Sequence, residues 1–205
     1  TGSLKMDINQ TMKRKDSIVS DMHLGLDFLM NKNNITILNG IGSFIDQNTI
    51  CITNDKKKDS VKGKNIIIAT GSKPFSLPSF KLDKNRIITS TEALTLKEIP
   101  KNLIVIGAGV IGLELGSVYA RMGSKVSVVD VESSVLSTMD SSLGRELKKV
   151  LTRDLGFKFY LSHQVEKVDS DGKTVELLAQ SNTEEPLTLT GDYCLVAIGR
   201  KPYTE

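Results

Sequence analysis

The stretch "NLIVIGAGVIGLELGSVYARMGSKVSVVD", residues 102–130, decides the fold of this chain. It opens with an apolar run, passes through three closely spaced glycines, continues with helix-forming residues, and ends in a second apolar run closed by Asp130. Short apolar runs bounded by turn residues indicate buried strands, and the segment between them predicts a helix over about 110–122. The stretch therefore predicts a strand–helix–strand unit of a parallel α/β sheet.

The glycines at 107, 109 and 112 form the pattern G-x-G-x-x-G between the strand and the helix. Gly107 permits a sharp turn, Gly109 lets the backbone approach a diphosphate, and Gly112 lets the helix pack closely on the strand. The free N–H groups and the dipole of the first helical turn then attract the phosphates. The pattern also occurs in tight turns of other α/β folds, so the flanking strand and helix are needed to indicate a dinucleotide site.

Asp130 ends the second strand, 18 residues after Gly112. An acid at this place accepts hydrogen bonds from the adenosine ribose and repels a 2′-phosphate. Residues 126–144 contain no Arg or Lys, which favours NAD over NADP. The alternative is a solvated carboxylate at the end of a strand.

The composition is that of an ordinary globular protein, with 205 residues, 39% hydrophobic and 25% charged. A net charge of +3 gives no argument for binding nucleic acid or a membrane, and no apolar run approaches the roughly 18 residues of a membrane span. Cys51 and Cys194 lie far apart, which indicates a reduced, intracellular setting and two small core residues. The sequence places no Ser, Cys or metal-ligand set at useful spacing from His23 or His163, so we expect no catalytic histidine and no metal site.

The first third of the chain predicts a helix followed by short strands. The spacing of apolar residues predicts a helix over 7–30. Strands are expected at 35–38, 41–45 and 49–53 as an antiparallel meander, with a solvated turn at "KKK" (56–58). The β-branched run 65–69 predicts a strand buried on both faces.

After a loop over 72–85, the remainder alternates between strands and helices. Strands are expected at 86–89, 157–161, 165–169, 173–179, 187–190 and 193–199. Helices are expected at 90–100, with a cap at Ser90 or Thr91, and at 141–154.

Three separated motifs resemble one family. They are "ATGSKPFSLP" (69–78), the long stretch 88–130, and "VAIGRKPYTE" (196–205). In this order they resemble the dihydrolipoamide dehydrogenases, among the FAD-containing pyridine nucleotide-disulfide oxidoreductases. The resemblance implies an α/β fold: a partial FAD-binding segment over 1–85 (helix, β-meander, strand) and a Rossmann-like NAD-binding domain over 86–205, with a parallel sheet and an antiparallel β-meander.

The resemblance also implies the cofactor-binding residues. For NAD they are Gly107, Ala108, Gly109, Val110, Ile111, Gly112, Leu113, Glu114, Asp130, Val165 and Gly199. For FAD they are Gly40, Ala69, Thr70, Gly71 and Ser72. At position 130 the family usually has Glu, so the acid of this chain is one methylene shorter.

Glu114 matches a residue that lies near the nicotinamide and flavin in relatives, where it pairs with a Lys. Because it follows the glycine loop on a helix with Leu113, Leu115 and Val118, we expect a buried carboxylate that supports the active site. The alternative is an exposed helix Glu.

The implied reaction oxidises a dihydrolipoyl group and passes a hydride from the flavin to NAD. The partners would be lipoyl domains of 2-oxoacid dehydrogenase complexes or the glycine cleavage system, with the full-length parent a homodimer in bacterial cytoplasm or mitochondrial matrix. The sequence holds no C-x-x-x-x-C and no terminal His-Glu pair. We therefore expect a piece that begins after the redox cysteines, carries no catalytic residue, and is inactive by itself.

Three alternatives stay open. Another disulfide oxidoreductase of the superfamily would share these motifs, although the acid at 130 argues against a glutathione reductase. A stand-alone nucleotide-binding module without turnover would explain the missing cysteines. An unrelated Rossmann dehydrogenase fits less well, because the match over 88–130 is long.

Overall fold

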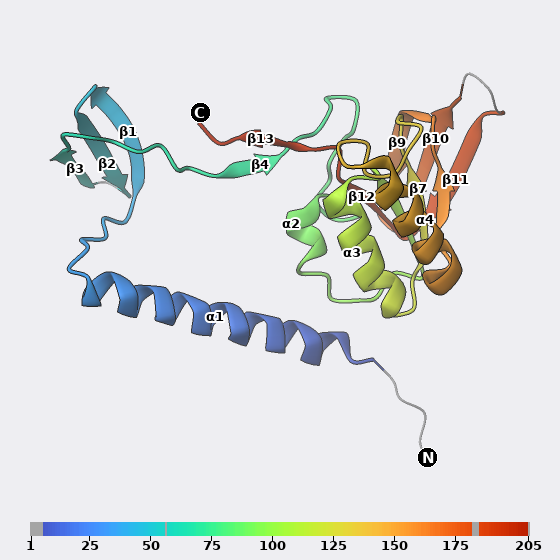
Figure 1. Cartoon of the computed structure of the whole chain (residues 1–205), viewed down its shortest axis with the longest axis horizontal. Coiled ribbons are helices and arrows are strands. Elements are labelled where there is room, and N and C mark those ends of the chain that lie inside the picture. The colour runs from blue at the N-terminus through green and yellow to red at the C-terminus, as the bar shows by residue number, and fades with distance from the viewer. Residues whose placement is uncertain (1–5, 56, 182–184, 205) are drawn as a thin grey trace, which may run out of the picture. The chain divides into compact units, whose positions relative to one another are not determined.

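The computed structural model describes residues 6–55, 57–181 and 185–204. The chain divides into two compact units, whose elements are labelled in Figure 1. Residues 10–70 form the N-terminal unit, and the described residues up to Asn9 and from Gly71 onward form the C-terminal unit. One sheet is parallel and the others are antiparallel, which confirms the predicted α/β class.

The N-terminal unit consists of helix α1 (Ile8–Lys32) and an antiparallel sheet of strands β1 (Ile41–Asp46), β2 (Thr49–Asn54) and β3 (Lys57–Lys62). The predicted helix and meander are confirmed, but the meander uses a different third strand. Residues 35–38 are not a strand, and β3 is built from the segment predicted as a turn. The backbone of β3 pairs with β2, Val61 facing Ile50, while its side chains stay exposed, so no apolar alternation announced it.

The prediction of a strand over 65–69 is wrong in this structure. These residues are not part of any strand, and Ile67 and Ile68 are 88% and 63% exposed. A β-branched run favours extended backbone, but it becomes a strand only where a neighbour offers N–H and C=O groups. No described strand does so here.

The C-terminal unit is built on a five-stranded parallel sheet. Its strands, in spatial order, are β5 (Ile87–Ile88), β12 (Tyr193–Val196), β6 (Asn102–Ile106), β7 (Lys125–Val129) and β8 (Lys158–Tyr160). The strand–helix–strand unit predicted from residues 102–130 is therefore β6, helix α3 (Val110–Arg121) and β7, at the middle of this sheet.

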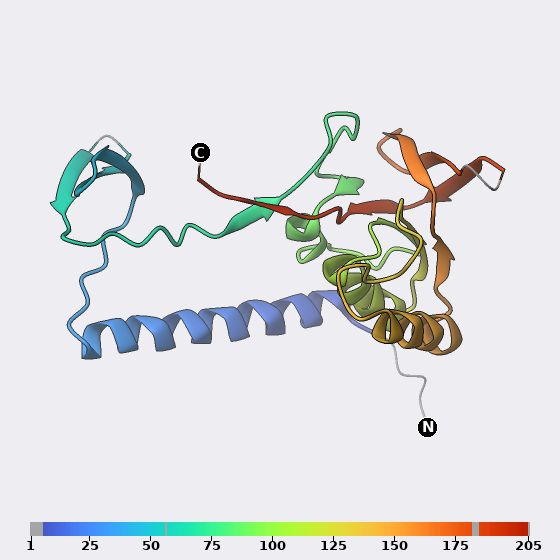
Figure 2. The same cartoon turned by 45° about the horizontal axis from the view of Figure 1, so that its top comes forward.

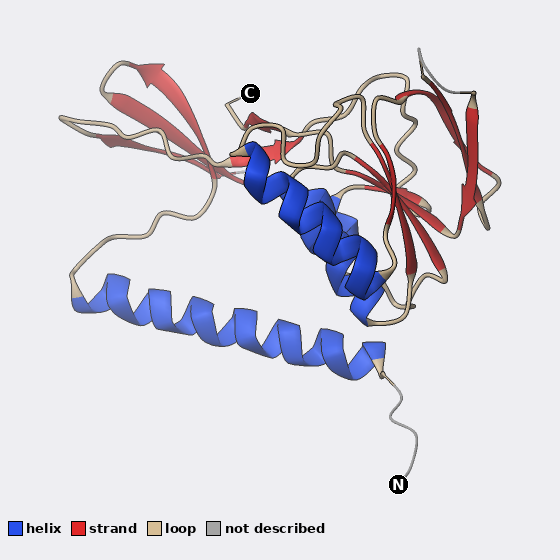
Figure 3. Cartoon of the chain, turned by 45° about the vertical axis from the view of Figure 1, so that its right-hand side comes forward, coloured by secondary structure: helices blue, strands red, loops and turns tan. Residues whose placement is uncertain are grey.

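Two different layers cover the two faces of the parallel sheet (Figure 3). Successive strand residues point to opposite faces. Leu103 and Val105 pack on the side of α3 and of helix α4 (Ser141–Leu155), whereas Ile104 and Ile106 pack against a second sheet. That second sheet is antiparallel and contains β9 (Gln164–Ser170), β10 (Val175–Gln180) and β11 (Leu187–Gly191).

Two further elements depart from the predictions. The helix expected over 90–100 is only α2 (Ser90–Ala93), capped by Thr89 rather than by Ser90 or Thr91. It ends early because Thr95 turns back and donates its N–H and hydroxyl to the Glu92 carbonyl. The expected loop 72–85 begins with β4 (Ser72–Pro74), which pairs with β13 (Arg200–Pro202) as a two-stranded ribbon (Figure 2). This pairing joins segments 128 residues apart in sequence, as in the bond from Arg200 Nε to the Ser72 hydroxyl.

None of the described helices has the length and apolar character needed to cross a membrane.

Candidate nucleotide-binding site

A cavity of about 670 Å³ lies at the carboxyl ends of β6, β7 and β12 in the C-terminal unit. Ligands of open parallel sheets bind at this edge, because loops leave the strands there and helix N-termini point toward it. Ile106, Val129 and Ala197 form its floor at the strand ends. The only charged side chains among its described lining residues are Asp130 and Glu132, so the wall carries no Lys or Arg.

The glycine loop forms one side of the cavity. Gly107 has φ +108, and a Cβ there would lie 2.4 Å from the Ala197 carbonyl oxygen. A Cβ on Gly112 would lie 2.2 Å from the Gly107 carbonyl oxygen. The packing of the chain itself therefore requires glycine at both positions.

Gly109 differs from the other two glycines. A Cβ there would meet no protein atom within 4 Å, and its backbone is extended with φ −81. Gly109 is the N-cap of α3 and has no side chain to cap the helix, so the first N–H groups of α3 are left without a side-chain acceptor. Nothing in the described part of the chain requires glycine at 109, whereas a ligand lying against the loop would.

Asp130 fastens the loop to the end of β7. One carboxylate oxygen accepts a hydrogen bond from the Ala108 N–H at 2.5 Å, and the other accepts from the Glu132 N–H at 2.8 Å. Asp130 also lines the cavity. The sequence suggested a ribose-binding acid; the structure adds this structural task, which the short Asp side chain can perform beside the loop.

Most residues predicted to hold NAD line the same cavity. These are Gly107, Ala108, Gly109, Val110, Ile111, Asp130, Val165 and Gly199. Gly112 and Leu113 are buried behind the loop and do not line the cavity.

The expectation that Glu114 is buried is wrong for this unit. Glu114 is exposed and does not line the cavity. The core face of α3 consists of Gly112, Leu113, Gly116 and Tyr119. Glu114 lies on another face, four residues from Val110 and from Val118, which are 50% and 45% exposed.

Several lining residues were not predicted. Phe75, Leu77 and Phe80 come from the segment expected as a loop, and Ser137 and Thr138 follow β7. The segment after β7 is held in place because the Leu136 N–H donates to the Ala108 carbonyl at 3.1 Å. Loop residues show no periodicity in the sequence. The only signal that could have indicated a cavity wall in this segment is its two aromatic residues, at positions 75 and 80.

His163 and Cys194 are buried, whereas Cys51, which was also expected in a core, is only partly buried. His163 is 3% exposed, and its Nδ1 lies 2.8 Å from the Leu161 carbonyl, which only accepts, so Nδ1–H is the donor. Cys194 is fully buried, which confirms the prediction of a core residue, and this burial raises the pKa of its thiol well above the usual range. The described residues contain no group of three His, Cys, Asp or Glu side chains that could hold a metal ion.

The residues predicted to hold FAD are divided between the two units. Gly40, Ala69 and Thr70 belong to the N-terminal unit, and Gly71 and Ser72 to the C-terminal unit. All five are exposed. Gly40 also has a reason within its own unit, because a Cβ there would lie 2.8 Å from the Thr53 carbonyl oxygen. The FAD assignment stays a prediction.

Comparison with known proteins gives matches along nearly the whole chain. Residues 3–205 match the family described as pyridine nucleotide-disulphide oxidoreductase. A mitochondrial dihydrolipoyl dehydrogenase of Pisum sativum is 41% identical over 204 residues, which is 98% of this chain and 40% of the relative. A dihydrolipoyl dehydrogenase of Cupriavidus necator is 39% identical, covering 100% of this chain and 43% of the relative. The chain thus spans about 40% of the length of the curated relatives it matches.

Solved structures give the same picture of the fold. LpdA of Mycobacterium tuberculosis superposes with a TM-score of 0.88 at 25% identity, covering 100% of this chain and 45% of that structure. The C43S mutant of the flavoprotein disulfide reductase RclA of Escherichia coli, in a Cu(II) complex, superposes with a TM-score of 0.85 at 27% identity. It covers 97% of this chain and 44% of that structure.

Proposed function

Because this chain belongs to the pyridine nucleotide-disulphide oxidoreductase family, we propose that residues 86–205 are the NAD-binding domain of a dihydrolipoamide dehydrogenase. Residues 1–85 would then belong to its FAD-binding domain. The observation that carries the proposal is Gly109, a glycine that faces open space at an N-terminus without a side-chain cap.

The residues of the cavity suit a dinucleotide. The first N–H groups of α3 and the positive end of its dipole would hold the diphosphate, with Gly109 leaving room for it. Asp130 marks the adenosine end, and Val165 supplies an apolar wall for the adenine. Gly199 would lie at the nicotinamide end, where a φ of +124 turns the chain from β12 into β13.

The charge of the lining favours NAD over NADP. A 2′-phosphate needs a cation, and the described residues of the lining offer two carboxylates and no Lys or Arg. At an effective dielectric constant of about 20, two like charges 4 Å apart repel by about 4 kcal/mol, which salt and solvent reduce.

The parent enzyme would oxidise a protein-bound dihydrolipoyl dithiol to a disulfide while NAD⁺ becomes NADH and one proton is released. FAD, when bound, would carry the two electrons between thiols and nicotinamide. The redox cysteines would lie in the parent outside these residues, and the exposed face of α3 with Glu114 would be available to meet that part. Lipoyl domains of 2-oxoacid dehydrogenase complexes or of the glycine cleavage system are the proposed partners, with a homodimeric parent in a mitochondrial matrix or bacterial cytoplasm.

Titration calorimetry of the 205-residue chain tests the proposal. We expect NADH to bind with a dissociation constant below about 1 mM, the upper end of usual KM values, and NADPH to bind at least about tenfold more weakly. The matched variant is Gly109→Val, whose side chain would enter open space and should leave the thermal unfolding of the chain unchanged while weakening NADH binding at least about tenfold.

A folded chain that takes up no NADH at millimolar concentration, or a Gly109→Val variant that binds NADH as well as the original, would contradict the proposal. The length of the parent reading frame separates the alternative of a stand-alone module, since that alternative requires a natural stop after Glu205.

A further inference from the structure

The ends of β7 and β8 are locked together beside the cavity. The Asp130 N–H donates to the Tyr160 carbonyl at 3.0 Å, and the His163 N–H donates to the Asp130 carbonyl at 2.9 Å. One residue pair further on, the Ser162 N–H donates to the Glu132 carbonyl at 2.9 Å. The backbone of Glu132 is therefore held in a fixed place, two residues beyond the strand, at the cavity wall.

Backbone hydrogen bonds already occupy both oxygens of the Asp130 carboxylate. Each of its oxygens accepts one backbone N–H, from Ala108 and from Glu132. An ionised carboxylate has about four lone-pair sites, so Asp130 retains capacity for a ligand, but its reach is fixed by those two bonds.

The carboxylate of Glu132, unlike that of Asp130, is not occupied by backbone N–H groups in the described part of the chain. Its side chain is exposed and lines the cavity, and no side chain or backbone group of the described residues donates to its carboxylate. An adenosine ribose brings two hydroxyl donors on neighbouring carbons. A carboxylate that only accepts, carried on a longer side chain and fixed at the backbone, is suited to take one of these hydroxyls beside Asp130.

Resting on the function proposed above, we propose that Glu132 is a specificity-determining residue of the dinucleotide site. Its carboxylate accepts one hydroxyl of the adenosine ribose beside Asp130, and its charge adds to the exclusion of a 2′-phosphate. The chain thus compensates for the short acid at 130 with a second acid two residues later. Asp130 fastens the loop and supports the sugar, and Glu132 completes the recognition of the diol.

Deoxy analogues of the ligand give the sharpest test, because they remove one hydroxyl at a time. The dissociation constants of NADH and of its 2′-deoxy and 3′-deoxy adenosine analogues are measured for the 205-residue chain and for Glu132→Gln. In the original chain, we expect one analogue to bind about tenfold more weakly than NADH, as for loss of a hydrogen bond to a charged group. In Glu132→Gln that penalty should fall to about twofold or less, and the ratio of NADPH to NADH affinity should rise at least about threefold.

The control is Glu146→Gln, which removes an equal charge from an exposed position on α4 outside the cavity lining. It should leave all ratios unchanged. Thermal unfolding of both variants checks that the fold is retained.

The inference fails if Glu132→Gln keeps the full deoxy penalty and the original NADPH-to-NADH ratio while NADH still binds. That result leaves the proposed function standing. Failure of the original chain to bind NADH at all would instead remove the proposed function and the inference with it.

Discussion

The two units of this chain differ in what they bury. The C-terminal unit has two apolar clusters in which Val105, Val128 and Leu195 are fully buried. In the N-terminal unit the only buried residue among those described is Thr49, and α1 buries none. Phe28, Phe44 and Ile67 of that unit are 65%, 53% and 88% exposed. Similar apolar patterns therefore lead to opposite degrees of burial. The pattern gives a helix or strand an apolar face, but that face is buried only where a neighbouring element packs on it.

The difference has a ready optical readout. All four tyrosines of the chain, at positions 119, 160, 193 and 203, belong to the C-terminal unit, and the chain has no tryptophan. Tyrosine fluorescence consequently reports the unfolding of the C-terminal unit alone, whereas far-ultraviolet circular dichroism includes α1.

The largest contrast is expected from truncating one apolar side chain in each unit. Leu195→Ala should lower the free energy of unfolding of the C-terminal unit by about 2–5 kcal/mol, because it leaves a cavity in the central sheet. Ile67→Ala should change the free energy of unfolding of the N-terminal unit by less than about 0.5 kcal/mol, since that side chain is almost fully exposed. Denaturant unfolding measures both effects, followed by tyrosine fluorescence for Leu195→Ala and by far-ultraviolet circular dichroism, which includes α1, for Ile67→Ala. Equal effects would refute the difference between the units.

A smaller effect is expected at high pH. Burial, with a lesser contribution from Tyr193, raises the pKa of Tyr119 to about 12 from 10.0, and its hydroxyl donates to the Ala93 carbonyl. The raised pKa means that Tyr119 stabilises the fold fully below pH 10, and that this contribution, about 2 kcal/mol, is lost as the pH rises toward 12. Tyr119→Phe should remove this part of the pH dependence. A denaturation midpoint that falls between pH 9.5 and 11.5 equally in both proteins would speak against the assignment.

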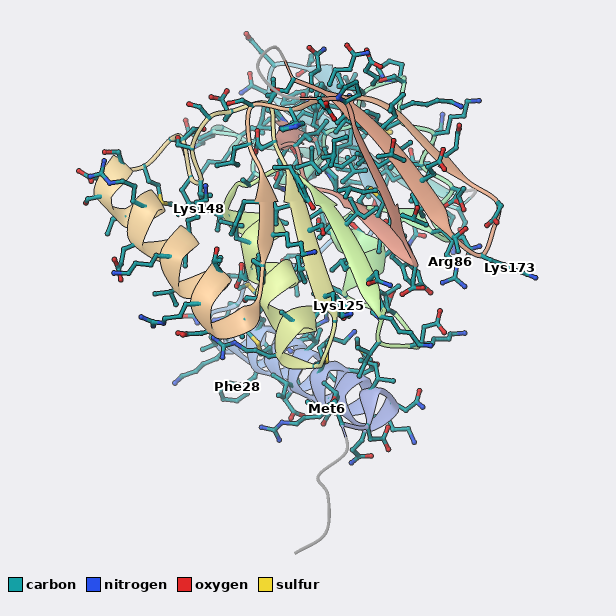
Figure 4. The ribbon with its side chains drawn as sticks, turned by 90° about the vertical axis from the view of Figure 1, so that its right-hand side faces the viewer. Met6, Phe28, Arg86, Lys125, Lys148 and Lys173 are labelled. Atoms are coloured by element: carbon teal, nitrogen blue, oxygen red, sulfur yellow. The ribbon has the colours of Figure 1, made fainter. Side chains whose placement is uncertain are left out.

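The smallest effect concerns Glu98, which bonds to Tyr193 of β12 and to Arg86, the residue before β5. Its carboxylate accepts from the Tyr193 hydroxyl at 2.8 Å and from Arg86 at 2.9 Å, and Arg86 also reaches the turn that carries Lys173 (Figure 4). The Tyr193 hydroxyl first, and Arg86 second, lower the pKa of Glu98 from 4.5.

Because the pKa is lowered, the stabilisation is present above pH 4.5 and is lost as the pH falls below it. The side chain is 59% exposed, so Glu98→Gln should cost less than about 1 kcal/mol at pH 7 and nothing measurable near pH 3. Chemical denaturation at both pH values measures this, and a loss that persists undiminished at pH 3 would exclude the ionic explanation.

The sequence predicted the C-terminal unit better than the N-terminal one for a physical reason. Within residues 102–130, β6, α3 and β7 pack on one another, so the elements that bury their apolar side chains lie in the same stretch of sequence. Residues 65–69 carry an equally strong apolar pattern, but no described strand lies beside them. β3 was missed because its strand rests on backbone pairing with β2 while its side chains remain polar and exposed.

The sequence predicted those residues of the candidate site that are glycines of the loop or lie at the end of a strand. Gly107, Gly109 and Asp130 could be found because each has a position that few residue types satisfy. The sequence could not show that Glu114 is exposed. Which face of α3 turns inward depends on Gly116, whose small size lets Phe157 pack against the helix. Glu132 was overlooked because its place depends on a hydrogen bond from the Ser162 N–H, which lies in the connection between β8 and β9.

The proposed function depends on the backbone amides at the start of α3, which would receive a diphosphate. Nuclear magnetic resonance of the ¹⁵N-labelled chain, titrated with NADH, tests it most directly. We expect the largest amide shifts on residues 109–112, while the amides of β1, β2 and β3 remain unchanged. Shifts spread over the N-terminal unit, with residues 109–112 unmoved at saturating NADH, would contradict it.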